Sequence, residues 1–378
     1  MQTLAIRKVP AARVVFSAES QAWVHERLTE VLSTGALTLG KYTQQFEKEF
    51  SDYIKVGYAV AVNSGTSALE IPLRIFGVGG REVIVPTNTF FATAAAVVHA
   101  GGIPRLVDID EKDLVPDLET LERAVSAKTA GIIVVHIGGA ISPRIPEIRS
   151  YCRSKGLFLL EDAAHAQGSS LNGQFAGTFG DAAAFSFYPT KVMTSGEGGM
   201  IVSNDAKIQE EALIYRDQGK AGFLENKHTR MGYNWRLSEI HALLGIVQLQ
   251  NLKPFIERRN AVARIYNEGV PRLKSLRPLA IPDGVVSNYY KYVALLDPAI
   301  DRPALKKQLR EEHGVSLSGE VYELPLHFQP IFKEFGRGTY PKAEKFCKTH
   351  VCLPVYSDMS EDEADYVVWS LEKTLGKN

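Results

Sequence analysis

Residues 156–165 read GLFLLEDAAH, an unbroken apolar run that ends in two acidic residues, Glu161 and Asp162. A strand that is buried on both faces shows such a continuous run, whereas a strand with one face in water alternates in polarity. The run therefore predicts an interior strand of a mostly parallel sheet. Ligands of such sheets bind beyond the carboxyl ends of the strands, where Asp162 lies. A solvated loop carboxylate or a helix cap is the alternative interpretation of Asp162.

Six more apolar runs repeat this pattern in the first 250 residues, with helical patterns between them. The strand-like runs are Ala59–Val62, Glu82–Val85, Arg105–Val107, Gly131–His136, Ala183–Phe187 and Met200–Val202. The helical patterns span 20–33, 67–76, 91–100, 118–126, 145–155 and 205–216. This alternation predicts an α/β fold in which helices flank a mostly parallel central sheet.

The pattern changes after a helical stretch that begins at Ser238 and is interrupted by Pro254. Further on, residues 286–297 and 315–324 are predicted to be strands, and 301–313 and 360–374 are predicted to be helices. We therefore predict a large α/β domain over residues 1–250 and a small α+β domain over residues 251–378.

Composition excludes several classes of function. Lys+Arg and Asp+Glu both number 43, and such a balance argues against a nucleic-acid partner. No run of about 18 apolar residues suggests a membrane span. The three cysteines show neither a disulfide framework nor a metal-ligand spacing. The N-terminal segment lacks the long apolar core of a signal peptide. We expect a cytoplasmic protein with no metal site.

Three other segments carry ligand-binding residue types, each after a predicted strand. Lys191 follows FSFYPT and precedes a glycine cluster, and a lysine there is either a solvated charge or an amine for Schiff-base chemistry. The small residues of NSGTS (63–67) precede a helix, so they form either a phosphate site or an ordinary N-cap. Phe90 either stacks on a planar ring or belongs to the core.

Together these segments supply what a site for pyridoxal phosphate (PLP) needs. Such a site has a phosphate cup, an aromatic ring for stacking, a lysine for the Schiff base and a carboxylate beside the pyridine nitrogen. The carboxylate keeps that nitrogen protonated, so that the ring can act as an electron sink. The residues therefore predict a PLP enzyme whose cofactor lies in the large domain on Lys191.

Six segments together resemble the DegT/DnrJ/EryC1/StrS family: NSGTSAL (63–69), VPTNTFFAT (85–93), LLEDAAHAQGS (159–169), FSFYPTK (185–191), SGEGGM (195–200) and GYNWRLSEIHALLGIVQL (232–249). The likeness runs from about residue 30 to 255 and more loosely to Tyr356. Members of the family are PLP-dependent aminotransferases of fold type I that act mainly on keto-sugars, often nucleotide-linked. The resemblance implies amino-sugar biosynthesis, in which glutamate or glutamine converts PLP to pyridoxamine phosphate and a keto-sugar then accepts the amine.

The resemblance also implies roles for single residues. Lys191 would form the Schiff base and shuttle a proton, Asp162 would pair with the pyridinium nitrogen, and His165 would lie near the ring and its 3-hydroxyl.

The matched cofactor-binding positions include a residue that serves a second subunit. Phe90 would stack on the ring, and Gly65, Thr66 and Ser186 would hold the phosphate. Asn234 would reach the phosphate of the partner subunit's cofactor, which implies a homodimer with shared active sites.

Departures from the family pattern leave alternatives open. Many members read HLYG where this chain has residues 136–139, HIGG, and the stretch from Gly314 to His327 contains an unusual SGEVYE. The keto substrate is therefore open, and Arg216 and Arg236 are equal candidates for binding the donor carboxylate. The alternative functions are a sugar dehydratase, whose relatives replace the lysine with histidine, another fold-type-I PLP enzyme, and a non-catalytic regulatory homologue.

Overall fold

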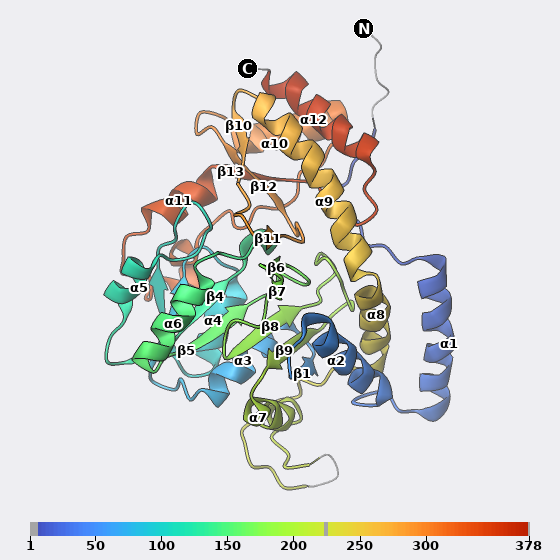
Figure 1. Ribbon diagram of the computed structural model, residues 1–378, viewed down its shortest axis with the longest axis vertical. Helices are drawn as coiled ribbons and strands as arrows, with labels where there is room; N and C mark the ends of the chain where they lie inside the picture. The colour runs from blue at the N-terminus through green and yellow to red at the C-terminus, as the bar shows by residue number, and fades with distance from the viewer. Residues whose placement is uncertain (1–6, 223–225, 377–378) are drawn as a thin grey trace.

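The structure, a computed structural model, describes residues 7–222 and 226–376. A seven-stranded sheet lies at its centre (Figure 1). Its strands in spatial order are β1 (Tyr58–Val62), β9 (Gly199–Ser203), β8 (Ala182–Ser186), β5 (Phe158–Asp162), β4 (Thr129–Val135), β2 (Glu82–Pro86) and β3 (Ile103–Val107). Only β9 runs antiparallel to its neighbours. The prediction of a mostly parallel sheet is thus confirmed.

Helices cover both faces of this sheet. On one face lie α2 (Lys41–Ile54), α5 (Leu118–Ala124), α6 (Ile145–Lys155) and α8 (Glu239–Gln250). On the other lie α3 (Gly65–Ile75), α4 (Phe91–His99) and α7 (Ala206–Arg216). Successive residues of β4 alternate between the two cores, with Ile132 in the first and Ile133 in the second. Both faces of the sheet are buried under helices, which explains why the strand sequences are continuously apolar.

The C-terminal third builds a smaller sheet with its own core. This sheet orders β10 (Leu276–Pro278), β12 (Tyr292–Leu296) and β13 (His350–Leu353). Around it pack α9 (Leu252–Gly269), α10 (Arg302–His313) and α12 (Glu361–Leu375), at the top of Figure 1. Val9 belongs to the same core and pairs with Val315. The domain boundary at residue 250 stays a prediction.

Two further helices and a small sheet complete the α-helices and strands of the described chain. They are α1 (Ala18–Thr34), α11 (Pro341–Lys348) and a small sheet of β11 (Val285–Val286), β6 (Ser170–Leu171) and β7 (Gln174–Phe175). Among the residues described, no helix is long and apolar enough to cross a membrane.

The strand predicted over residues 315–324 is wrong. Only Val315 and Ser318 make isolated bridges there. Farther along, the Val321 N–H donates to the His350 ring at 3.0 Å, and the Tyr322 hydroxyl lies 3.0 Å from the His165 ring. Hydrogen bonds to side chains therefore take the place of strand pairing.

The strand predicted over residues 286–297 is confirmed only for its second half, Tyr292–Leu296. Before it, the Asn288 N–H and side-chain amide donate to Ser169, His165 and Gln167 at 2.9–3.0 Å. These bonds tie residues 287–290 to the loop after β5, and so place Tyr290 beside Lys191.

Helix α2 was not predicted, because its N-terminal support comes from far away in the chain. The buried carboxylate of Glu239, at the start of α8, accepts the N–H groups of Gly40, Tyr42 and Thr43 at 3.0, 2.8 and 2.9 Å. It also accepts the Thr43 hydroxyl. Glu239 thus caps a helix whose own N-cap, Gly40, makes no side-chain cap bond.

Replacing Glu239 with alanine should lower the free energy of unfolding by about 3 kcal/mol, because buried donors left without an acceptor cost about 1–3 kcal/mol each. Glu239→Gln, which keeps an acceptor, should cost about half as much. The measurement is the urea midpoint at constant slope. Glu268→Ala, on the exposed side of α9, serves as the control and should stay within about 0.5 kcal/mol of wild type. An equally small effect of Glu239→Ala would contradict the capping role.

Candidate active site

Most of the candidate residues gather at the carboxyl edge of the large sheet. Asp162 ends β5 and Ser186 ends β8, while Gly65 begins α3 directly after β1. Phe90 is the N-cap residue of α4 after β2. Because all four of these strands run in the same direction, their ends meet at one edge, as the ligand-binding rule for such sheets requires.

Lys191 lies five residues past the end of β8, with its ammonium nitrogen 4.7 Å from the centre of the Tyr290 ring. Burial lowers the pKa of Lys191 to about 8, although the charge of Asp162 raises it and that of Lys291 lowers it further. A large fraction of this amine is therefore neutral near pH 8, as a Schiff-base nucleophile must be.

Asp162 is a buried carboxylate without a cationic partner. Its two oxygens accept the Thr93 hydroxyl at 2.7 Å and the Ala164 N–H at 3.2 Å. No Lys, Arg or His of the described chain lies within 4.0 Å of it. Burial raises the pKa of Asp162, although the charge of Lys191 acts in the opposite direction, so a cation in direct contact would stabilise the carboxylate. The protonated ring nitrogen of PLP would supply that charge, so Asp162 fits the cofactor.

Residues suited to a phosphate lie at the start of α3. A Cβ added to Gly65 would lie 2.7 Å from the Cβ of Ser186, so a glycine is needed for this turn to touch the end of β8. Ser64 caps the helix by accepting the Ser67 N–H at 3.1 Å. In the described chain the Gly65 and Thr66 N–H groups have no hydrogen-bond partner, as expected for a first helical turn. Together with the Ser186 hydroxyl they can bind a phosphate.

His165 is buried and neutral, which fixes its tautomer. The Gly138 N–H donates to its Nδ1 at 3.3 Å, and burial lowers the pKa of His165 well below its ordinary value. The ring proton is therefore on Nε2, which donates to the Tyr322 hydroxyl at 3.0 Å. This leaves the hydroxyl proton of Tyr322 free to donate into the site. Phe90, whose ring centre lies 5.7 Å from that of Tyr322, is half exposed and available for stacking.

Asn234 lies next to the end of β1, since the Asn63 N–H donates to the Trp235 carbonyl at 2.9 Å. Its side chain is exposed, and its backbone carbonyl accepts the Asn63 amide at 3.4 Å.

Both arginine candidates for the donor carboxylate are already paired. Arg216 is buried against Glu47 and the Ala61 carbonyl, and Arg236 donates to Asp217 at 2.5 Å. Neither guanidinium is thus free to bind a substrate.

Sequence reasoning missed four residues of this site: Thr93, Tyr290, Lys291 and Tyr322. Thr93 lies in the quoted segment VPTNTFFAT, one helical turn after Thr89, and could have been found there. The other three come from stretches that were predicted to be strands, and only the folded chain brings them to Lys191 and His165.

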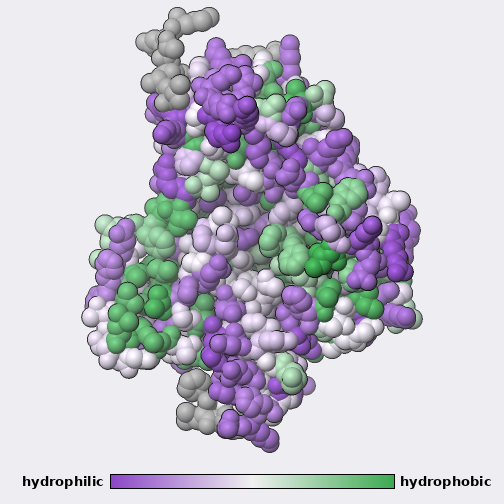
Figure 2. Space-filling view, turned by 180° about the vertical axis from the view of Figure 1, so that it is seen from behind, coloured by the Kyte–Doolittle hydropathy of each residue, from purple (hydrophilic) through white to green (hydrophobic). Residues whose placement is uncertain are grey.

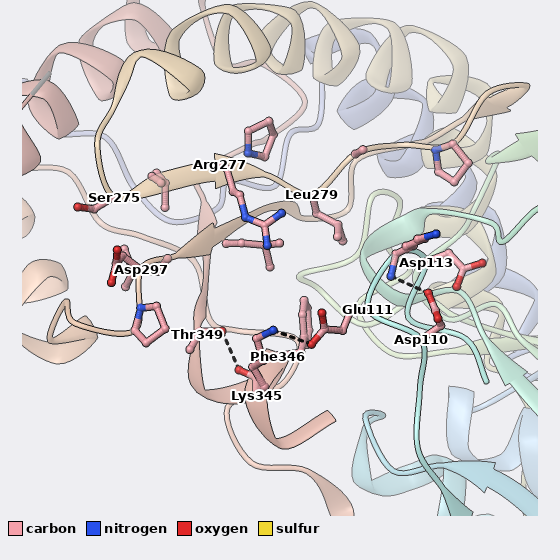
Figure 3. Close-up of a pocket in the computed structure, with 18 of the residues that line it drawn as sticks. Asp110, Glu111, Asp113, Ser275, Arg277, Leu279, Asp297, Lys345, Phe346 and Thr349 are labelled. Atoms are coloured by element: carbon pink, nitrogen blue, oxygen red, sulfur yellow. Dashed lines mark hydrogen bonds and ion pairs between the residues drawn. The ribbon is translucent and has the colours of Figure 1, made fainter. Parts of the chain in front are cut away.

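A large hollow lies apart from this site. It has a volume of about 900 Å³ and lies between β10, α11 and residues 110–113 (Figure 3). None of the candidate residues lines it, and charged groups at its rim pair with one another, as Lys345 does with Glu111 at 2.9 Å. The hollow is thus separate from the site around Lys191.

Comparison with known proteins identifies the family. The model of the DegT/DnrJ/EryC1/StrS aminotransferase family matches residues 19–372. The chain is 34% identical over 360 residues to the spore coat polysaccharide biosynthesis protein SpsC of Bacillus subtilis (strain 168), covering 91% of this chain and 92% of SpsC. It is 31% identical over 369 residues to GDP-perosamine synthase of Escherichia coli O157:H7, covering 97% and 99%.

A solved structure of a cofactor-bound protein agrees in fold. The PLP form of Spr1654 from Streptococcus pneumoniae superposes with a TM-score of 0.88 at 27% identity, covering 97% of this chain and 98% of that chain. The chain therefore belongs to the DegT/DnrJ/EryC1/StrS aminotransferase family, and it is a transaminase that uses pyridoxal phosphate.

Proposed function

We propose that this transaminase moves an amino group from glutamate or glutamine to a keto-sugar carried on a nucleotide, as a step of amino-sugar biosynthesis. One relative of nearly the same length is a synthase named for a GDP-linked amino sugar. The observation that carries the proposal is that one site holds both Lys191, a lysine of lowered pKa, and Asp162, a buried carboxylate. A dehydratase of the kind considered above would have histidine in place of Lys191.

Each residue of the site has a part in this reaction. PLP, when bound, supplies an electron sink for the carbon that loses or gains a proton. Lys191 would hold it covalently, and its neutral amine would then carry the proton to and from the substrate carbon. Asp162 would hold the ring nitrogen protonated, while Ser186 together with Gly65 and Thr66 at the start of α3 would bind the phosphate.

We propose a homodimer whose two sites are shared, with Asn234 reaching the partner's cofactor. Support comes from the exposure of large apolar side chains near this residue, since Met231 is 86% and Tyr233 51% exposed. Figure 2 shows apolar residues gathered in patches on one face of the molecule, and such patches are typical of interaction surfaces. We also propose a cytoplasmic location, because the cysteines of the chain are free thiols, as is usual in a reducing compartment.

The proposal is tested by the visible spectrum of the purified protein. The PLP-loaded enzyme should be yellow, lose the colour on addition of L-glutamate or L-glutamine, and regain it with a nucleotide-linked keto-sugar. Bleaching by other amino acids alone would contradict the proposed donors. Recovery of colour with simple 2-keto acids but with no sugar would contradict the proposed acceptor.

Removing the Tyr322 hydroxyl should lower kcat about tenfold. Tyr322→Phe leaves the buried Nε2–H of His165 without its acceptor, a loss of about 1–3 kcal/mol. In a His165→Ala background the same change should have little further effect, because the two side chains act through one hydrogen bond. Tyr151→Phe, at a half-buried position of α6, should leave kcat unchanged. Independent, multiplying effects of the two substitutions would argue against this coupling.

A further inference from the structure

Lys291 is held against the same turn that holds His165. It precedes β12, and its backbone N–H donates to the Gly138 carbonyl at 3.1 Å. The Gly138 N–H in turn donates to the His165 ring. The position of Lys291 is therefore coupled to the candidate site by two successive hydrogen bonds.

The ammonium groups of Lys291 and Lys191 flank one aromatic ring. Their nitrogens lie 5.2 and 4.7 Å from the centre of the Tyr290 ring, so they are at most 9.9 Å apart, the sum of these distances. The charge of Lys291 lowers the pKa of both Lys191 and His165. The site thus contains a second cation within reach of a small substrate.

This second cation has no anion. Across residues 7–222 and 226–376, the Lys291 ammonium makes no hydrogen bond or ion pair, although it is half buried. The acidic side chain that acts on it, Glu320, already pairs with Lys306 at 2.7 Å. Nearby Arg259 donates to the Tyr289 and Val355 carbonyls rather than to a carboxylate. Burial removes part of the water around this ammonium group without supplying an anion in its place. A bound anion would therefore offset the lost hydration.

We propose that Lys291 binds the α-carboxylate of the amino-acid donor while the donor amine meets the cofactor at Lys191. This proposal rests on the proposed function and names a residue for a task that neither Arg216 nor Arg236 is free to perform.

The position of the donor's carboxylate, next to its amine, favours it over a phosphate of the acceptor. In an amino acid, a carboxylate oxygen lies about 3 Å from the amine nitrogen, and a hydrogen bond to Lys291 adds about 3 Å. The total, about 6 Å, is compatible with the separation of the two lysine nitrogens, which is at most 9.9 Å. In a nucleotide sugar the diphosphate is separated from the reacting carbon by atoms of the sugar ring, whereas the α-carboxylate is bonded to the carbon that carries the amine.

The test measures the binding of 2-methylglutamate to the PLP-loaded enzyme, by the visible spectrum and by calorimetry. This amino acid has no α-hydrogen to lose, so the measurement reports binding without transamination. For Lys291→Met we expect the half-saturation concentration to rise at least about tenfold, because a charge-assisted hydrogen bond is lost. Lys291→Arg, which keeps the charge, should stay within about threefold of wild type. The affinity of the pyridoxamine-loaded enzyme for the nucleotide-sugar acceptor should change less than about twofold.

Other outcomes decide against the proposal in distinct ways. Unchanged binding of 2-methylglutamate by Lys291→Met would overturn it, and so would loss of acceptor affinity instead, which would assign Lys291 to the diphosphate. Lys274→Met, an exposed lysine before β10, is the matched control and should behave as wild type. If the wild-type enzyme binds PLP but no amino acid alters its spectrum, the proposed function itself fails, before any variant is compared.

Discussion

Replacing Lys191 with alanine should lower the rate of transamination at least about a thousandfold, because in the proposed reaction this one side chain both holds the cofactor and moves the proton. The geometry leaves no substitute. Lys291 also lies at the Tyr290 ring, but its backbone is tied to the turn at Gly138, whereas Lys191 lies in the segment after β8. A small amine such as methylamine, added at high concentration, should restore part of the proton transfer.

Borohydride reduction followed by peptide mapping identifies the lysine directly. The reduced cofactor should be found on Lys191 in the wild-type enzyme, and Lys191→Ala should carry none. Lys253→Ala, at an exposed position of α9, should label and react like wild type. Label on a different lysine, or more than about a tenth of wild-type activity in Lys191→Ala, would exclude the role proposed for Lys191.

The lowered pKa of Lys191 gives this variant a second measurement, which needs no cofactor. Folding places this pKa at about 8, below the ordinary 10.5. Between these values the unfolded chain holds more protons than the folded chain, so the free energy of unfolding should rise with pH over this window. The contribution is absent below about pH 8, where both states are protonated. Lys191→Ala should therefore show a smaller rise from pH 8 to 10.5 than the wild-type apoprotein.

The sheet could be predicted because each strand carries its own signal. A run such as GLFLL is apolar at every position, since Leu159 packs in one core and Leu160 in the other. The residues that follow these runs, such as Asp162, then fall at one edge by the geometry of parallel strands. Local sequence was therefore sufficient to locate most of the predicted site.

The rest of the site depends on contacts between distant parts of the chain. Tyr322 reaches His165 across 157 residues, and Glu239 caps α2 across about 200. No local periodicity reports such pairs, and the irregular backbone around Tyr322 has the apolar and β-branched composition of a strand. Asn234 differs again, because its proposed target lies on another subunit.

Asp162→Asn should lower kcat by about a hundredfold to several thousandfold while leaving the fold intact. Removing one partner of a buried ion pair costs about 3–5 kcal/mol, and about 1.4 kcal/mol corresponds to a factor of ten in rate. Asparagine has nearly the same volume and can still accept the Thr93 hydroxyl, so the loss isolates the negative charge. Without that charge the ring nitrogen is no longer held protonated, and the electron sink is weakened.

A measurement on the apoprotein separates this electrostatic role from a structural one. Because the charge of Asp162 raises the pKa of Lys191, the asparagine variant should label Lys191 with an amine reagent at a lower pH midpoint than wild type. Asp362→Asn, whose side chain is 79% exposed, should change neither kcat nor this midpoint. Retention of kcat within about tenfold, or a midpoint that stays at about 8, would mean that Asp162 does not act through its charge. A coupled fall of both quantities would instead show that one buried carboxylate tunes the two ends of the site, the ring nitrogen on one side and the lysine amine on the other.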